Sequence, residues 1–411
     1  MPDSASTTSE WQIETVEGAV TAPAGFLAAG VSCGIKAAGL DFALIVPAVT
    51  ASAAGLFTTN RAVAAPVVLS RQHLKESGGL AKAIVVNSGC ANACTGSDGF
   101  AVARSTAELV ARGVGCTPDQ VLVASTGVIG VSLDLQKIAR GVSVGLEKLR
   151  SDGGHDAALA IMTTDVAPKE KAVRVQTSRG AFHVGGIAKG AGMIEPMMAT
   201  MLAFVTCDAA VPPPILRKAL AEVTADTFNA ITVDGECSTN DSVIALANGA
   251  SGVEIDDGGY PALVEGLRSV CQHLAVEIVR GGEGATKLVT IRVTGANSRA
   301  DAQRAARTIA NSPLVKTAIH GGDPNWGRLV AAAGRAGVPF DLEKATITIG
   351  TVELFKNGQP FDGLAPQAAV YLQGKEIAIH VDLGTRGTHE ATMWTCDFSA
   401  EYVRINADYR T

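Results

Sequence analysis

The sequence predicts a protein of mixed helices and strands, in the α/β or α+β class. Two observations support this class: short β-branched runs alternate with segments of helical periodicity, and the chain is apolar enough to bury large cores. Its 411 residues are 47% hydrophobic and 18% charged, a composition that excludes intrinsic disorder and a long coiled coil as the main structure. At roughly 150 residues per domain, this length allows about two or three domains.

The N-terminal two thirds of the chain predicts alternating strands and helices. Strands are expected at 83–86, 121–123 and 201–205, where small and β-branched apolar residues run together. One helix is expected over 102–110, ended by Gly113, because its apolar residues recur at helical spacing. Another should begin after three consecutive prolines at 212–214, since proline is tolerated in the first turn.

From Lys287 onward the hydrophobic pattern changes to a period of two. Strands are therefore expected at 288–293, 345–349, 375–381 and 390–398. The polar stretch 294–301 is the best candidate for a boundary, although an ordinary inter-strand loop explains it equally well. We therefore expect a catalytic domain over 1–294 and a smaller C-terminal α/β domain over 295–411.

Charge and cysteine usage exclude several classes of partner and location. The net charge is −6 and no basic run is present, which argues against nucleic acid as a partner. The first lysine is Lys36, so a basic secretory signal is not indicated, and no apolar run reaches the ~20 residues that span a membrane. The eight cysteines are mostly scattered, so we expect free thiols, no metal site and a cytoplasmic protein.

Glycine-rich loops suggest nucleotide binding, but none fits a known fingerprint. The loop at 190–195 has Glu195 where a dinucleotide motif needs its third glycine. The loop at 281–286 has Thr286 where a P-loop needs the glycine before its lysine. Zinc-protease and Gly-x-Ser-x-Gly hydrolase motifs do not occur either.

The segment 189–202 contains four of the seven methionines and leaves two interpretations open. A Met-rich apolar stretch usually fills a core, and here it would form a buried hairpin. Alternatively, Thr200 becomes an N-terminal nucleophile once the Ala199–Thr200 bond is cleaved. The new α-amino group, with a pKa near ~7.7 to 8.0, would then accept the hydroxyl proton of the same residue.

Such chemistry needs donors for a developing oxyanion, and Ser125-Thr126-Gly127 can supply them. A hydroxyl and a glycine amide following a strand suit that purpose. A plain turn at the end of the strand explains the same residues.

Motifs along nearly the whole chain resemble the ArgJ family, the glutamate N-acetyltransferases or ornithine acetyltransferases. They are STGVIG, IMTTD, AKGAGMIEPMMATML, DGECSTND, GGEGATK, NSPLVKTAIHGGDPNWGR and the terminal YVRINADYRT. The resemblance implies a DmpA/ArgJ-like layered sandwich with helices outside central β-sheets. It also implies self-cleavage between Ala199 and Thr200 into α and β chains, which are expected to form an α2β2 heterotetramer.

The implied reaction is a ping-pong transfer through acetyl-Thr200, from N2-acetyl-L-ornithine to L-glutamate, in cyclic arginine biosynthesis. Thr126 and Gly127 then match the family's oxyanion hole. Its substrate contacts fall on Thr163, favoured over Thr164, and on Lys189, Thr200, Glu283, Asn406 and Thr411. Small zwitterionic substrates agree with this set, because Lys189 can face a carboxylate and Glu283 an ammonium.

By pattern alone these residues have ordinary explanations as well. Lys189 and Glu283 could be solvated ion-pair members, and Asn406 and Thr411 would be tail residues. The resemblance instead implies that the C-terminal tail returns to the active site. A further group should support the site or shape its loops: Asp234, Asn240, Asp323, Asn325 and Arg328.

Two competing functions remain: a DmpA-type aminopeptidase or amidase that hydrolyses its acyl-enzyme, and a non-catalytic binding protein whose Thr200 never becomes a terminus. No cofactor is expected, while use of acetyl-CoA as a co-substrate stays open. Met197 stands where many members have Asn or Asp, which puts the rate of self-cleavage in doubt.

Overall fold

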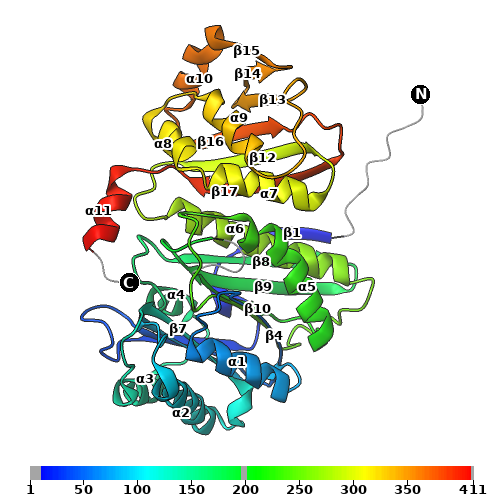
Figure 1. Ribbon diagram of the computed structural model, residues 1–411. Helices are drawn as coiled ribbons and strands as arrows, with labels where there is room; N and C mark the ends of the chain where they lie inside the picture. Colours follow the sequence, from blue (N-terminus) through cyan, green and yellow to red (C-terminus); the bar gives the residue numbers. More distant parts are fainter. Residues whose placement is uncertain (1–10, 196–200, 409–411) are drawn as a thin grey trace.

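The computed structural model describes residues 11–195 and 201–408, and these form three β-sheets with helices packed around them (Figure 1). The prediction of a mixed, layered α/β architecture with helices outside central sheets is confirmed.

A seven-stranded sheet forms the middle layer of the molecule. Its pairings are antiparallel except for β10 with β11, and β10 and β11 are buried along their whole lengths. In spatial order its strands are β1 (Trp11–Val16), β8 (Lys169–Thr177), β9 (Gly180–Lys189), β10 (Leu202–Cys207), β11 (Ser242–Ala247), β4 (Ala51–Phe57) and β5 (Leu80–Ala81).

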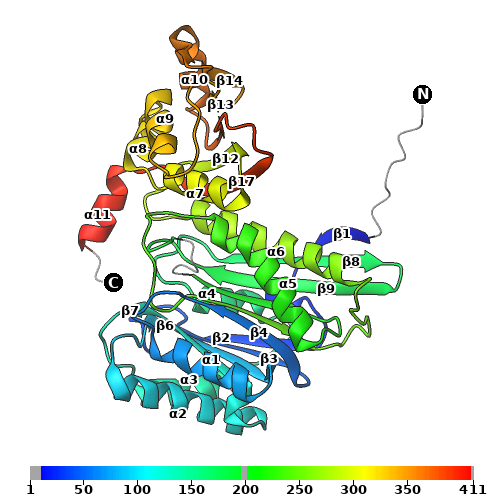
Figure 2. The same cartoon turned by 45° about the vertical axis from the view of Figure 1, so that its right-hand side comes forward.

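A four-stranded sheet packs face to face on this layer (Figure 2). Apolar side chains such as Ile84 and Phe204 fill the space between the two sheets. Its strands in spatial order are β2 (Phe26–Val31), β3 (Phe42–Pro47), β6 (Ala83–Cys90) and β7 (Val121–Val128). The short helix α4 (Gly154–Ala160) contributes Ala157 and Ala158 to the same core.

Amphipathic helices cover the outer faces of the two sheets. On the four-stranded sheet lie α1 (Ala65–Glu76), α2 (Gly96–Val114) and α3 (Leu135–Glu147). On the seven-stranded sheet lie α5 (Pro213–Asp226) and α6 (Tyr260–Arg280). The predicted stop at Gly113 is wrong by two residues: α2 ends at Val114, and the residue that caps it is Gly115, whose φ of 72° is left-handed.

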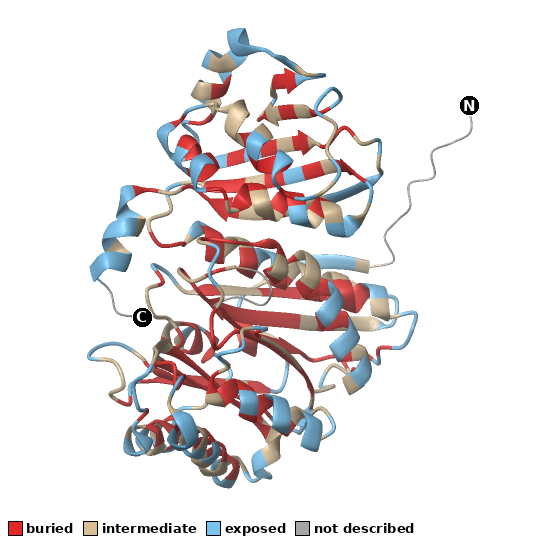
Figure 3. Cartoon of the chain, viewed as in Figure 1, coloured by how far each residue is buried: buried red, intermediate tan, exposed pale blue. Residues whose placement is uncertain are grey.

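A third, six-stranded sheet belongs to the C-terminal part of the chain and has its own core. Its strands in spatial order are β15 (Gln359–Pro360), β14 (Val352–Lys356), β13 (Thr346–Ile349), β16 (Glu376–Asp382), β12 (Leu288–Ala296) and β17 (His389–Cys396). Four helices pack around it: α7 (Arg299–Ala310), α8 (Pro313–Gly321), α9 (Trp326–Gly334) and α10 (Ala365–Tyr371). The last helix, α11 (Ala400–Asp408), has no buried residue (Figure 3).

The boundary expected between residues 294 and 295 falls inside β12. This strand belongs to the third sheet from its first residue, Leu288, onward. The polar stretch 294–301 suggested a linker because it interrupts the apolar alternation. In the structure its first three residues complete the strand, and Arg299 begins α7.

Candidate active site

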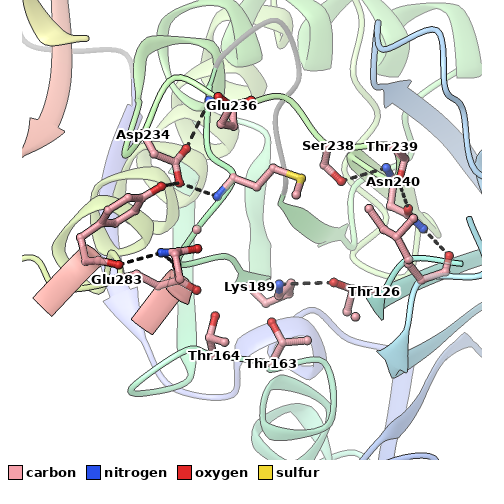
Figure 4. A pocket seen from close by; sticks show the side chains of 17 residues that line it. Thr126, Thr163, Thr164, Lys189, Asp234, Glu236, Ser238, Thr239, Asn240 and Glu283 are labelled. Carbon is pink, nitrogen blue, oxygen red and sulfur yellow. Dashed lines mark hydrogen bonds between the residues drawn. The ribbon is translucent and has the colours of Figure 1, made fainter. Parts of the chain in front are cut away.

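One pocket, with a cavity volume of about 130 Å³, gathers residues from widely separated parts of the chain (Figure 4). Six predicted site residues line it: Thr126, Gly127, Thr163, Lys189, Glu283 and Asn406. Ala199, Thr200 and Thr411 lie outside the residues that the structure describes.

Thr126 and Gly127 lie within β7 and not in a turn after it. The prediction of a strand ending at residue 123 is wrong, because pairing with β6 continues past Gly127. Gly127 has a φ of 129°, and a Cβ there would stand 2.3 Å from the carbonyl carbon of Gly89. Only glycine fits this position, and its backbone lines the pocket beside Thr126.

Asn240 fixes the loops around this end of β7. Its buried side-chain amide donates to the carbonyl oxygens of Ala91 at 2.7 Å and Ser125 at 2.8 Å. Its Oδ1 accepts a hydrogen bond from the Thr239 hydroxyl. Asn240 thus has the loop-shaping role considered for it. Through its bond to Ser125, it fixes the residue that precedes Thr126.

Lys189 ends strand β9 as a buried ammonium, only 3% exposed. Its Nζ donates to the Thr126 hydroxyl at 3.3 Å (Figure 4). Burial lowers the pKa of Lys189, and the Asp165 carboxylate opposes this effect by stabilising the charged form. Across the sheet, Lys189 pairs with Leu202, the first residue of β10.

Asp165 connects Lys189 and Thr163, and the sequence did not single it out. Its Oδ1 accepts from Lys169 Nζ at 2.5 Å and from the Gly190 amide at 2.7 Å, while Oδ2 accepts from the Thr163 amide at 3.0 Å. Burial alone would raise the pKa of Asp165, but the ammonium groups of Lys189 and Lys169 lower it to about 2.

Both threonines of the IMTTD motif face the cavity, so the lining does not separate Thr163 from Thr164 (Figure 4). The amide of Thr163 is the one fixed by Asp165.

Asp234 organises the opposite wall. Its carboxylate accepts from the amides of Met193 at 2.7 Å and Ile194 at 2.8 Å, and from the Tyr402 hydroxyl at 3.2 Å. Met193 has a positive φ of 58°, so these bonds hold a backbone conformation that a non-glycine residue rarely adopts. Burial raises the pKa of Asp234, while its hydrogen bonds lower it.

Glu283 and Asn406 meet although 123 residues separate them in sequence. Asn406 Nδ2, on α11, donates to Glu283 Oε2 at 2.9 Å. Gly192 makes room for this carboxylate, because a Cβ there would stand 2.4 Å from Glu283 Oε2. The C-terminal helix thus returns to the pocket through Asn406 and Tyr402.

The remaining candidates have structural positions outside the pocket lining. Asn325 caps α9 by accepting from the Arg328 amide at 3.1 Å. The Arg328 guanidinium donates to the Leu314 carbonyl at 2.8 Å, and Asp323 Oδ2 accepts from the Asn325 amide group at 3.1 Å. These contacts shape the loop between α8 and α9.

The Thr126 hydroxyl, the Gly127 backbone and the buried Lys189 ammonium lie together in the pocket, and the carboxylates of Asp234, Glu236 and Glu283 are among its other lining groups. Such a site suits an acyl-transfer enzyme, because it offers donors to a carbonyl oxygen that gains negative charge. Within residues 11–195 and 201–408, no three His, Cys, Asp or Glu side chains are placed to hold a metal ion, and no helix is long and apolar enough to cross a membrane.

Comparison with known proteins identifies the family. The model of the ArgJ family matches residues 27–411. The arginine biosynthesis bifunctional protein ArgJ of Synechocystis sp. is 48% identical, over 98% of this chain and 100% of the relative. Its namesake from Symbiobacterium thermophilum is 47% identical, over 97% of this chain and 100% of the relative. The chain therefore belongs to the ArgJ family and is an enzyme, which confirms the resemblance seen in its motifs.

Two solved structures are similar as well. The crystal structure of arginine biosynthesis bifunctional protein ArgJ from Bacillus halodurans is 40% identical with a TM-score of 0.49, covering 50% of this chain and 98% of that one. Ornithine acetyltransferase from Mycobacterium tuberculosis, solved in complex with ornithine, is 42% identical with a TM-score of 0.42, covering 45% of this chain and 98% of that one.

Proposed function

We propose that this protein transfers an acetyl group from N2-acetyl-L-ornithine to L-glutamate in arginine biosynthesis, with Thr200 as the acetyl carrier. The relatives' names support the pathway. The observation that carries the site is the convergence of Thr126, Gly127 and Lys189 with Glu283 and Asn406 in one pocket.

The nucleophile is generated by cleavage of the Ala199–Thr200 bond. The Thr200 hydroxyl attacks the Ala199 carbonyl, and the C–N bond breaks as the hydroxyl proton passes to the nitrogen. Water hydrolyses the resulting ester, which frees the hydroxyl of Thr200 and the carboxylate of Ala199. The pairing of Leu202 with Lys189 supports this location, because Leu202 lies two residues after Thr200 in sequence.

In the transfer reaction, the Thr200 hydroxyl attacks the acetyl carbonyl of the donor and gives its proton to its own α-amino group. Thr126 and Gly127 donate hydrogen bonds to the oxyanion. The ornithine amine takes up a proton and leaves, and an acetyl ester remains on Thr200. The glutamate amine then attacks this ester and releases N-acetylglutamate and the free hydroxyl.

The other contacts orient the two amino acids. We assign Thr163 and the Lys189 ammonium to a substrate carboxylate, and Glu283, Asn406 and Thr411 to the α-nitrogen that the two substrates share. We further propose that acetyl-CoA can replace N2-acetylornithine as the acetyl donor, and that the enzyme needs no bound cofactor. We also propose that the α and β chains assemble as α2β2 and that the protein works in the cytoplasm.

Intact-mass measurement of the denatured protein, with N-terminal sequencing, tests the generation of the nucleophile. Two chains are expected, the second beginning Thr-Met-Leu-Ala-Phe. The Thr200→Ala variant should stay uncut and inactive, whereas Thr200→Ser should retain part of the self-cleavage and part of the acetyl transfer. Normal processing of Thr200→Ala would contradict the proposal.

Assays without acetylornithine test the second activity. Formation of acetylglutamate from acetyl-CoA and glutamate alone is expected. Its absence would restrict the enzyme to recycling, and release of free acetate in place of acetylglutamate from acetylornithine would favour the amidase alternative.

A further inference from the structure

Within the described part of the chain, three side-chain carboxylates line the pocket, and they differ in how the protein uses them. Asp234 accepts bonds from two backbone amides and the Tyr402 hydroxyl, and Glu283 accepts a bond from Asn406. The third, Glu236, is exposed. Within the described residues its backbone amide bonds to Asp234, but its carboxylate has neither a hydrogen bond nor an ion pair. Among the described lining residues, Glu236 is thus the carboxylate that has no side-chain partner in the protein.

The pocket is also polarised. Among the lining residues that the structure describes, the positive charge belongs to Lys189, buried beside Thr126, where the acyl group reacts in the proposed function. Figure 4 shows Glu236 next to Asp234, on a different side of the cavity from Thr126 and from the pair Thr163 and Thr164. A substrate held at Thr126 therefore meets negative charge when its free end extends toward Glu236.

The two proposed amino-acid substrates differ at that free end. Both react through their α-nitrogen and both carry an α-carboxylate, so their side chains extend into the same part of the pocket. The ornithine side chain ends in an ammonium, whereas the glutamate side chain ends in a carboxylate. A negative charge there attracts the first and repels the second.

We propose that Glu236 determines substrate specificity by binding the side-chain ammonium of the acetyl donor and disfavouring the side-chain carboxylate of the acceptor. This inference rests on the proposed function, since it concerns the two substrates named there. Glu236 takes no part in bond making. It sets the balance between two substrates of opposite side-chain charge that use one site in turn.

The Glu236→Gln variant tests this role because it removes the charge and keeps the shape. We expect the KM for N2-acetylornithine to rise about two- to fivefold and the KM for glutamate to fall by a similar factor, with kcat little changed. Changes of opposite sign are diagnostic, because a distorted pocket would weaken both substrates. Both changes should shrink at high ionic strength, since the charge is exposed.

N2-acetylnorvaline is the matched probe, because it has the carbon chain of acetylornithine without the ammonium. Its kcat/KM should be equal in wild type and Glu236→Gln. Glu147→Gln, which removes an exposed charge at the end of α3 outside the pocket lining, should leave every constant unchanged.

Unchanged constants, shifts of the same sign, or an equal effect on acetylnorvaline would overturn the role of Glu236. Glu236→Lys should invert the preference further, raising the KM for acetylornithine and lowering that for glutamate beyond the Gln variant. Failure of the proposed function would appear differently, as a wild-type protein that makes no acetylglutamate from acetylornithine and glutamate.

Discussion

The two walls of the pocket are built in opposite ways. The inner wall is formed by Thr126, Gly127 and Lys189 at the ends of β7 and β9. Sheet pairing fixes all three residues, and Thr126 and Lys189 are buried. The outer wall includes α11, which has no buried residue and bonds to the site through Tyr402 and Asn406. In the proposed function, stabilisation of the oxyanion therefore falls to residues fixed in the sheets, whereas part of the substrate contact falls to an exposed helix.

Breaking the inner wall should have the largest effect. Gly127→Ala places a Cβ against the Gly89 backbone at a φ of 129°, so it displaces the amide proposed to stabilise the oxyanion. We expect kcat to fall about 100- to 1000-fold. Gly130→Ala is the control, because Gly130 has a φ of 78° but open space around its Cβ position. Retention of more than about a tenth of the activity in Gly127→Ala would contradict the assignment.

Asp165→Asn should weaken the contacts that Asp165 makes behind the inner wall, with Thr163, Lys169 and Gly190. It leaves Lys169, only 4% exposed at its side chain, without its ionic partner. Breaking a buried pair costs about 3 kcal/mol, and kcat/KM should fall at least about tenfold as Thr163 and Gly190 shift. Urea unfolding and kinetics measure the two effects. Asp152→Asn, at an exposed ion pair, should cost less than about 1 kcal/mol, and equal losses in both variants would refute the special role of Asp165.

The same carboxylate predicts a dependence of stability on pH. Its folded pKa of about 2 lies below the ordinary 3.8, so its contribution is fully present above about pH 5 and is lost as the pH falls through 2. This contribution amounts to about 2 kcal/mol. Between about pH 6 and pH 3, wild type should therefore lose more unfolding free energy than Asp165→Asn. Parallel pH profiles would argue against the depressed pKa.

The outer wall should be less sensitive. Tyr402→Phe removes one of the donors to Asp234 and should cost about 1 kcal/mol, seen as a several-fold rise in KM with little change in kcat. Tyr371→Phe is the matched control, since its hydroxyl accepts a bond from the Ala378 amide in the C-terminal sheet. A fall in kcat as large as that of Gly127→Ala would remove the distinction between the walls.

The sequence indicated residues of the inner wall, Thr126 and Gly127, but not the residues that hold the pocket walls in place, such as Asp165 and Tyr402. Thr126 and Gly127 were recognisable because a hydroxyl beside a glycine near a strand has a local chemical meaning. The strand nevertheless continues through them, since Gly127 packs against the Gly89 backbone of the neighbouring strand, a contact that local propensity does not reveal.

Asp165 and Tyr402 were missed because their roles depend on distant partners. Asp165 accepts from Gly190, 25 residues away, and Tyr402 from α11 reaches Asp234 across 168 residues. A signal for Asp165 existed in Lys169, four residues later, but this spacing also occurs in any solvated helix. Family resemblance supplied Asn406, which its own pattern would have left as a tail residue.

The central claim is that Thr200 carries the acetyl group, and trapping the acyl-enzyme tests it most directly. The protein is mixed with N2-acetylornithine without glutamate, quenched in acid, and examined by intact mass and peptide mapping. One added acetyl group is expected on the fragment beginning at Thr200, and it should disappear with formation of N-acetylglutamate when glutamate is added. Full turnover with no acetylated fragment, or an acetyl group on another residue, would contradict it.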